Sequence, residues 1–144
     1  MLKQLLLIFL LLTTTLFAED ARLKHYSGAV EWERDAKTNA VSAYNLGYTY
    51  QTQIKDYEKA IYWYKKAYEL DKNNEAANNL GYLYDDLKDY KEAIKWYKRA
   101  VEKGHVQSVY NLALLYDKKL KDYPSAIKYY EKAYEMGDMG GHII

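Results

Sequence analysis

The sequence predicts an all-α protein, an α-solenoid of stacked antiparallel helix pairs, and three observations support this fold class. Apolar residues recur with helical spacing rather than with the alternation of a strand. A phrase that begins Asp-Tyr occurs three times, 33 residues apart on both occasions. A second phrase of helical spacing precedes each copy. Self-similarity at a fixed period of this length indicates units that bury their apolar faces against their neighbours.

The Asp-Tyr phrase predicts the second helix of each unit. It reads DYEKAIYWYKKAYEL at residues 56–70, DYKEAIKWYKRAVEK at 89–103 and DYPSAIKYYEKAYEM at 122–136. In the first copy, Ala60, Tyr64 and Ala67 lie on one helical stripe. The aspartate of each copy stands where an N-cap belongs, and Asp89 with Glu92 matches a capping box.

The preceding phrase predicts the first helix of each unit. It reads AYNLGYTY at residues 43–50, ANNLGYLY at 77–84 and VYNLALLY at 109–116. Its leucine recurs at spacings of 34 and 32, so we expect loops of slightly different length. The expected helices are residues 40–53 with 56–71, 75–87 with 89–103, and 106–119 with 122–136. The short connections make paired helices antiparallel.

Small residues at equivalent positions predict close contact between helices. The matching alanines are Ala60, Ala93 and Ala126, then Ala67, Ala100 and Ala133. Gly47 and Gly81 also match, with Ala113 in the third unit. A glycine inside a helix costs about 1 kcal/mol relative to alanine, so two at equivalent positions indicate a packing requirement. We expect the equivalent tyrosines Tyr64, Tyr97 and Tyr130 to fill the larger gaps between units.

These residues carry a family resemblance. The pattern L-G-x-x-Y, followed by the spaced alanines and aromatics, resembles the tetratricopeptide repeat (TPR). The tandem aromatics within A-I-x-W-Y-x-x-A are similar to the related Sel-one-like repeat (SLR), including its secreted bacterial members. The resemblance implies a right-handed superhelix and covers nearly all of the chain after its first residues. The proline that usually closes a TPR unit is missing, with Lys72, His105 and Asp138 in its place.

The repeats divide the chain into segments. The boundaries we expect are a signal peptide at 1–18, a degenerate half repeat at 19–39, repeats at 40–73, 74–105 and 106–137, and a truncated tail at 138–144. Residues 24–37 align with a second helix, with Glu33 in place of the core tyrosine. We expect this polar variant to cap the array. Nothing comparable follows the third repeat, so the array either ends uncapped or belongs to a longer family.

The first residues, MLKQLLLIFLLLTTTLFA, have the layout of a secretory signal peptide. A basic start is followed by an apolar run from Leu5 to Leu12 and a small residue, Ala18, before the expected cut. The run is shorter than the ~20 residues that span a bilayer. We therefore expect an exported protein, periplasmic or secreted, with no stable membrane span after cleavage. An uncleaved anchor is the alternative.

Charge and composition exclude several kinds of partner and chemistry. The chain has 21 basic and 20 acidic residues, and cleavage after Ala18 removes one lysine, so the mature chain is formally neutral. Nucleic acid binding requires a basic face, so we expect none. The chain has no cysteine, which excludes disulfides, thiol catalysis and cysteine-ligated metals. The three histidines lack metal-ligand spacing, and we expect no metal and no cofactor.

The first helices of the units supply the candidate binding site, because they line the concave face of a stacked array. The candidate peptide-binding residues are Tyr44, Asn45, Tyr48, Asn78, Asn79, Tyr82, Asp85, Tyr110, Asn111 and Asp117. An asparagine recurs in all three units, at 45, 79 and 111, and an amide can donate to and accept from a peptide backbone. The resemblance also implies peptide binding by this asparagine. The expected partner is therefore a protein or extended peptide.

Two other functions compete with this scaffold. A β-lactamase-like hydrolase is suggested by kinship to cysteine-rich secreted repeat proteins. The absence of cysteines argues against it, so we expect no enzyme activity. A self-assembling structural protein is the second alternative, through the uncapped C-terminal repeat. Nitrocefin hydrolysis would reveal the hydrolase, and concentration-dependent sedimentation would reveal self-association.

Overall fold

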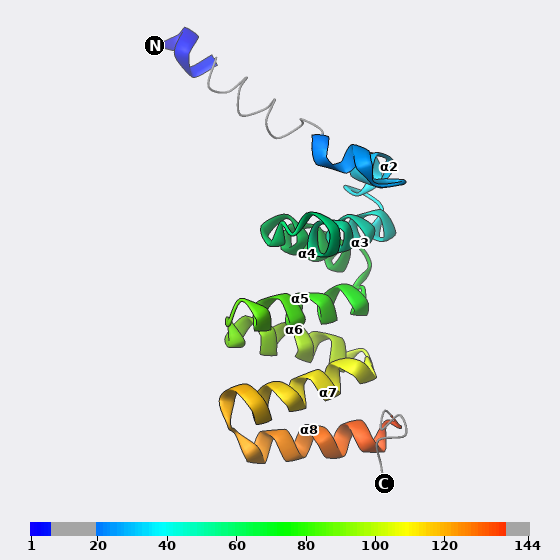
Figure 1. The fold of residues 1–144 in the computed structure, drawn as a ribbon, viewed down its shortest axis with the longest axis vertical. Coiled ribbons are helices and arrows are strands. Elements are labelled where there is room, and N and C mark those ends of the chain that lie inside the picture. The colour runs from blue at the N-terminus through cyan, green and yellow to red at the C-terminus, as the bar shows by residue number, and fades with distance from the viewer. Residues whose placement is uncertain (7–19, 138–144) are drawn as a thin grey trace.

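The helices stack into one elongated array with α2 at one end and α8 at the other (Figure 1). The computed structural model describes residues 1–6 and 20–137, and all regular structure within them is helical. The elements are η1 (Ala21–His25), α2 (Ala29–Asp35), α3 (Ala40–Thr49) with η2 (Tyr50–Ile54), α4 (Tyr57–Asp71), α5 (Asn74–Asp86), α6 (Tyr90–Glu102), α7 (Val106–Leu114) with η3 (Leu115–Leu120), and α8 (Tyr123–Glu135). The predicted all-α repeat solenoid is confirmed.

Each second helix begins at the aspartate that the sequence indicates. The side chains of Asp56, Asp89 and Asp122 each accept a hydrogen bond from a backbone N–H in the first turn of the helix, at 3.2 Å in all three repeats. Only half of the capping box expected at Asp89 is formed. The backbone N–H of Asp89 donates to the carbonyl of Tyr84 at 2.8 Å, while the Glu92 carboxylate pairs with Lys95 at 3.3 Å.

The spacing differences between repeats appear inside the first helices rather than in the loops. Repeats one and three have one more residue than repeat two between the shared leucine and the N-cap aspartate. In both, the first helix ends in a π-helical segment, η2 or η3, whereas α5 has none. A π turn accommodates one extra residue within a helix. The helix pairs therefore keep the same register despite the insertion.

A lysine precedes each N-cap aspartate and has a left-handed backbone. Lys55, Lys88 and Lys121 have φ values of 64°, 61° and 56°. Residues with a Cβ rarely adopt this backbone conformation, because the Cβ approaches the following carbonyl oxygen. The turn between paired helices is thus the same in every repeat and carries a small conformational cost.

Lys88→Gly is therefore expected to stabilise the protein, by about 0.5–1 kcal/mol, because glycine adopts positive φ without strain. Lys98→Gly, in the middle of α6, is the matched control and should destabilise by about 1 kcal/mol. Urea unfolding of both variants measures the two signs. Destabilisation by both would mean that the turn at Lys88 is not left-handed.

Close contact between paired helices explains the two glycines. A Cβ placed on Gly47 would lie 2.6 Å from the ring of Tyr64, and the ring of Tyr97 blocks the same space at Gly81. Tyr64 and Tyr97 are 0% and 1% exposed. In the third repeat Ala113 replaces the glycine, and its tyrosine, Tyr130, is only half-buried. The glycines therefore allow each tyrosine ring to lie directly on the neighbouring helix.

The N-terminal half repeat differs from the sequence expectation. Residues 24–37 do not form one helix, because Gly28 has φ 80° and separates η1 from a shorter α2. Glu33, aligned with the core tyrosines, instead accepts from the backbone N–H of Asp20 at 3.2 and 3.3 Å. Leu23 of η1 is fully buried, so the segment still covers the first repeat.

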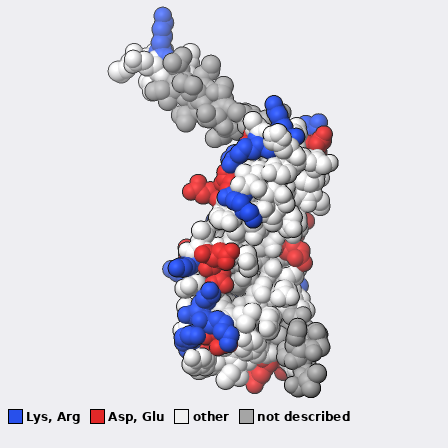
Figure 2. Space-filling model, in the orientation of Figure 1, with Lys and Arg blue, Asp and Glu red and all other residues white. Residues whose placement is uncertain are grey.

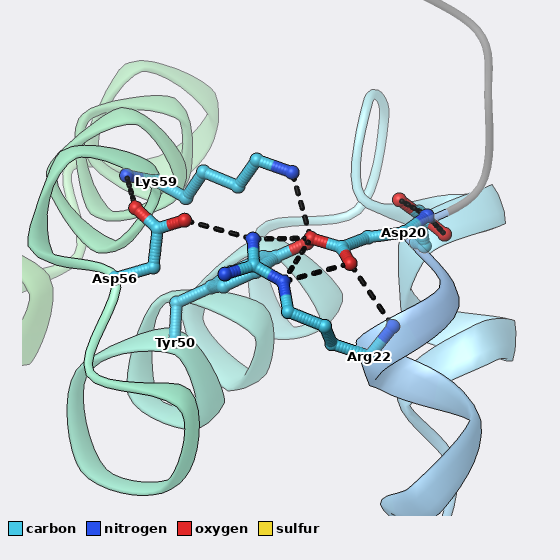
Figure 3. A network of polar contacts seen from close by, with 6 residues as sticks. Asp20, Arg22, Tyr50, Asp56 and Lys59 are labelled. Atoms are coloured by element: carbon cyan, nitrogen blue, oxygen red, sulfur yellow. Dashed lines mark hydrogen bonds and ion pairs between the residues drawn. The ribbon is translucent and has the colours of Figure 1, made fainter.

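A polar network joins this segment to the first repeat (Figure 3). The carboxylate of Asp20 is bound by the guanidinium of Arg22 and the ammonium of Lys59, both at 2.7 Å, and accepts from the hydroxyl of Tyr50 at 3.0 Å. Arg22 also pairs with Asp56 at 2.8 Å. These bonds connect η1 and its N-cap with η2 and with the start of α4, residues thirty or more positions away in sequence.

Two sequence predictions lie outside the described residues. Most of the expected signal peptide falls in 7–19, and the expected tail is 138–144. None of the helices in the described part of the chain has the length and apolar character needed to cross a membrane.

Candidate peptide-binding surface

All ten candidate residues lie on the first helices of the repeats. We call this the first-helix surface: Tyr44, Asn45 and Tyr48 on α3, Asn78, Asn79, Tyr82 and Asp85 on α5, Tyr110 and Asn111 on α7, and Asp117 on η3. Tyr48 and Tyr82 are 51% and 49% exposed, and they occupy equivalent positions in successive repeats. The remaining eight side chains are partly buried.

Asn79 is hydrogen-bonded to the first repeat. Its amide Nδ2 donates to the hydroxyl of Tyr64 at 3.1 Å and to that of Tyr44 at 3.3 Å. The hydroxyl of Tyr64 donates in turn to Gln51 at 2.7 Å. Burial raises the pKa of both the Tyr64 and Tyr44 hydroxyls, so both stay protonated. Both amide hydrogens of Asn79 are used within the protein, and its Oδ1 is the atom left to accept from a ligand.

A second network joins repeats two and three. The Oδ1 of Asn78 accepts from Asn111 Nδ2 at 3.0 Å and from the hydroxyl of Ser108 at 2.8 Å. The ring of His105 lies 2.8 Å from the Ser108 hydroxyl and 2.9 Å from a carboxylate oxygen of Glu75. The asparagines at equivalent positions thus have different surroundings. Asn111 bonds to Asn78, Asn79 bonds to two tyrosines, and the side chain of Asn45 has no hydrogen bond to a described residue.

The position held by Gln51, Asp85 and Asp117 in the three repeats also has different surroundings. Gln51 and Asp117 each accept from the tyrosine of their own second helix, Tyr64 at 2.7 Å and Tyr130 at 3.2 Å. Asp85 stands at the same position in repeat two, and its Oδ1 is buried without a hydrogen-bond partner among the described residues. Burial raises the pKa of Asp85. A donor from a ligand would satisfy this oxygen.

Sequence reasoning missed several members of these networks. Tyr64 was expected to serve packing alone, yet its hydroxyl connects Gln51 to Asn79. Ser108 is fully buried and His105 caps α7. The repeat alignment held a signal for both, because Ser108 aligns with Ser42 of repeat one and His105 aligns with Asn39 and Asn73, which cap the other first helices.

Figure 2 shows the distribution of charged side chains over one face of the array. In the view of Figure 2, charged side chains of both signs gather mainly along one long edge of the array, and much of the remaining face is uncharged. A nucleic acid interface requires a continuous basic surface. Within residues 1–6 and 20–137, no group of His, Cys, Asp or Glu could hold a metal ion.

Asn79→Asp is expected to reduce stability by about 1–2 kcal/mol, because it replaces an amide that donates to two partly buried hydroxyls with an acceptor. Asn45→Asp is the matched control at the equivalent position, where no described hydrogen bond is lost, and should change stability by less than about 0.5 kcal/mol. Urea unfolding compares the two. Equal effects would show that the Asn79 bonds are not formed in solution.

Comparison with known proteins identifies the repeat. A family model described as "Anaphase-promoting complex, cyclosome, subunit 3" matches residues 53–133, more than half of the chain. The chain belongs to this family of tetratricopeptide-like repeats. Among solved structures, the crystal structure of MamA matches with a TM-score of 0.63 and 25% sequence identity. No curated protein matches.

The match to MamA covers 74% of this chain and 63% of the MamA chain, so the present chain spans less than two thirds of that protein. Both comparisons support the TPR-like resemblance seen in the sequence. A TPR-like array points to a scaffold rather than an enzyme, because its repeated residues serve packing between helices. The secreted and Sel-one-like features of the sequence remain predictions.

Proposed function

We propose that this protein is an exported scaffold that binds an extended segment of a partner protein along the first-helix surface. The observation that carries the proposal is the pair Tyr48 and Tyr82, half-exposed rings at equivalent positions of α3 and α5. Tyrosine supplies a large apolar contact area together with a hydrogen-bonding hydroxyl, which is why it is frequent at binding surfaces. The family supports this assignment, because TPR-like repeats typically bind proteins.

The polar groups beside these rings suit a peptide backbone. The Oδ1 of Asn79 and the whole amide of Asn45 remain able to bond to backbone groups of a ligand. The unpartnered oxygen of Asp85 adds an acceptor beside Tyr82. Asp86 follows Asp85 in the sequence, and Asp117 occupies the position equivalent to Asp85 in repeat three. A segment with lysine or arginine therefore fits best. The proposed occupant is therefore an extended segment with apolar and basic side chains.

A peptide-display selection on the full chain tests this assignment, with the affinity of selected peptides measured by fluorescence anisotropy. The double variant Tyr48→Ala/Tyr82→Ala should weaken binding at least about tenfold, which corresponds to about 1.4 kcal/mol. Tyr62→Ala is the matched control, because Tyr62 is 59% exposed but lies on the second helix α4. Equal losses, or a loss confined to Tyr62→Ala, would place the site elsewhere.

Export is part of the proposal. A signal peptide at 1–18 would leave Glu19 as the first residue, directly before Asp20, whose carboxylate is already bonded within the fold. Cleavage there would keep every described bond of the N-terminal network. Cell fractionation with N-terminal sequencing tests it, and a full-length chain retained in the membrane would favour the uncleaved anchor.

Self-association is a second candidate function, and one observation favours it. Ile127 and Tyr134 on α8 are 57% and 58% exposed, whereas Val101, equivalent to Tyr134, is only 8% exposed and packs against the following repeat. On α6 the equivalent apolar surface is covered by α7. On α8 the outward apolar surface stays exposed. Sedimentation velocity over a concentration series tests this, and a monomer at all concentrations would reject it.

A further inference from the structure

A groove of about 430 Å³ lies between the second helices of repeats one and two. It is lined by Lys65, Tyr68, Glu69 and Lys72 from α4 and its C-cap, and by Trp96 and Arg99 from α6. Three cations and one carboxylate therefore surround two aromatic rings. A neighbouring hollow on α6 shares Arg99 and adds Lys91, Lys95 and Lys98, which extends the basic character along the helix.

The two aromatic rings hold Arg99 in place. Its guanidinium carbon lies 4.4 Å from the ring centroid of Trp96 and 5.6 Å from that of Tyr68, and the two rings meet edge to face at 5.3 Å. Lys72 lies 5.1 Å from the Tyr68 ring. A guanidinium fixed by aromatic contacts loses little further entropy when it binds a carboxylate with its planar array of N–H groups.

The cations of the groove have no acidic partner. The side chains of Arg99, Lys65 and Lys72 form no ion pair or hydrogen bond with any residue in the described part of the chain. In contrast, Lys66 and Lys95 pair with Glu69 and Glu92. An arginine that is partly buried yet unpaired retains all its N–H donors for a ligand. The charge of the groove is therefore complementary to an anion.

Trp96, which lines the groove, also has an unused donor. Trp96 is 5% exposed, and its Nε1 is buried without a hydrogen-bond partner among the described residues. A buried donor that lacks a partner is rare in folded proteins and often marks a site that another molecule completes. This observation is independent of the lysines and arginine, and it indicates an acceptor group in the ligand.

The repeat does not require this arrangement for packing. The positions equivalent to Arg99 are Lys66 and Lys132, and the position of Tyr68 becomes Val101 in the next repeat. The corresponding place between α6 and α8 therefore lacks both the arginine and the ring beneath it. The combination occurs once among the three repeats, as expected of a binding site rather than of a scaffold element.

We propose that this groove between α4 and α6 binds the carboxylates of an acidic protein segment, on a surface separate from the first-helix surface. Arg99 would take a carboxylate through its N–H groups, with Lys65 and Lys72 beside it. Nucleic acid fits less well, because affinity for a phosphate backbone grows with the number of phosphates neutralised and the chain as a whole is close to neutral. An acidic segment needs only a few local contacts.

Fluorescence anisotropy with the full chain and a fluorescein-labelled peptide of alternating glutamate and glycine tests the proposal. The glutamate peptide should bind, and the peptide with glutamine in place of glutamate should not. Arg99→Gln should weaken binding at least about tenfold, and Arg99→Lys, which keeps the charge and the stem, should give a smaller loss. Lys132→Gln, at the equivalent position of repeat three, is the control and should stay within about twofold.

Thermal melting of each variant separates binding from folding. Losses of affinity in a variant that melts as the parent does support the groove. If Arg99→Gln fails to fold, Lys65→Gln and Lys72→Gln must together produce the loss, and unchanged binding in that double variant overturns the proposal. Equal weakening by Lys132→Gln, or equal competition by a single-stranded oligonucleotide or by vesicles of anionic lipid, also overturns it.

Discussion

Gly81→Ala is expected to destabilise the protein by about 2–3 kcal/mol, although alanine is the better helix former. The added Cβ would meet the ring of Tyr97, which is 1% exposed and surrounded by Ala93, Leu112 and Leu115. The ring cannot move outward without displacing α7, so the strain reaches the contact between repeats two and three. Because each repeat is stabilised by its neighbours, a defect in the middle unit weakens both sides.

The reverse substitution, Ala113→Gly, is the control at the equivalent position of repeat three. There the Cβ is already accommodated, and removing it should destabilise by only about 1 kcal/mol through helix propensity. Chemical denaturation measures both. If Gly81 had free space, Gly81→Ala would instead stabilise by about the same amount, so the sign of its effect decides whether Tyr97 lies against α5.

The parts of the fold that sequence could predict are those that repeat. Three kinds of residue recur in register: the N-cap aspartates, the small residues and the core tyrosines. The role of each can be inferred from one repeat, and its recurrence in the other repeats supports that inference. Gly47 and Gly81 were recognised as packing positions because a glycine inside a helix requires an explanation. The structure shows that the explanation is a tyrosine ring in both cases.

The parts that sequence could not predict depend on one repeat or on contacts between repeats. The extra residue in repeats one and three was visible as a spacing, but whether a loop or a π turn absorbs it depends on how the paired helices pack. The asparagines appeared equivalent, yet Asn79 and Asn111 bond to different partners, because the preceding repeat offers Tyr44 to Asn79 and Asn78 to Asn111. The peptide-binding role of the first-helix surface stays a prediction.

The half repeat shows the limit of alignment. Ala29, Trp32 and Ala36 matched the second-helix pattern, and Ala29 and Ala36 are fully buried as that pattern requires. The alignment did not account for Gly28, whose positive φ makes α2 begin at Ala29 rather than at residue 24. Nor did it indicate Asp20, whose partners Tyr50 and Lys59 are thirty or more positions away.

Asp20→Asn is expected to destabilise the protein by about 2 kcal/mol at neutral pH, because it removes the charge from a carboxylate that binds two cations and a hydroxyl. The Asp20 side chain is 8% exposed, but Arg22 and Lys59 are each about half exposed, so solvent screening limits the effect. Asp35→Asn is the matched control. Asp35 is about half exposed and pairs with Arg34, which is largely exposed, so its loss should change stability by less than about 1 kcal/mol.

Lowering the pH should remove the stabilisation that the charged Asp20 side chain provides. Its hydrogen bond from Arg22 holds its pKa well below the ordinary range, against the opposing effect of burial, and Lys59 adds to the lowering. In the unfolded chain the Asp20 carboxyl has a pKa of about 3.9, which is higher than its pKa in the folded protein. As the pH falls, the unfolded state therefore binds a proton before the folded state does. The stabilisation is therefore full above that pH and decreases below it.

The free energies of unfolding in urea of the parent chain and of Asp20→Asn should differ most at neutral pH and converge in acid. Hydrogen exchange in η1 and α2 should be faster in the variant. A difference that does not change with pH would mean that the network of Figure 3 is not the source of the stability.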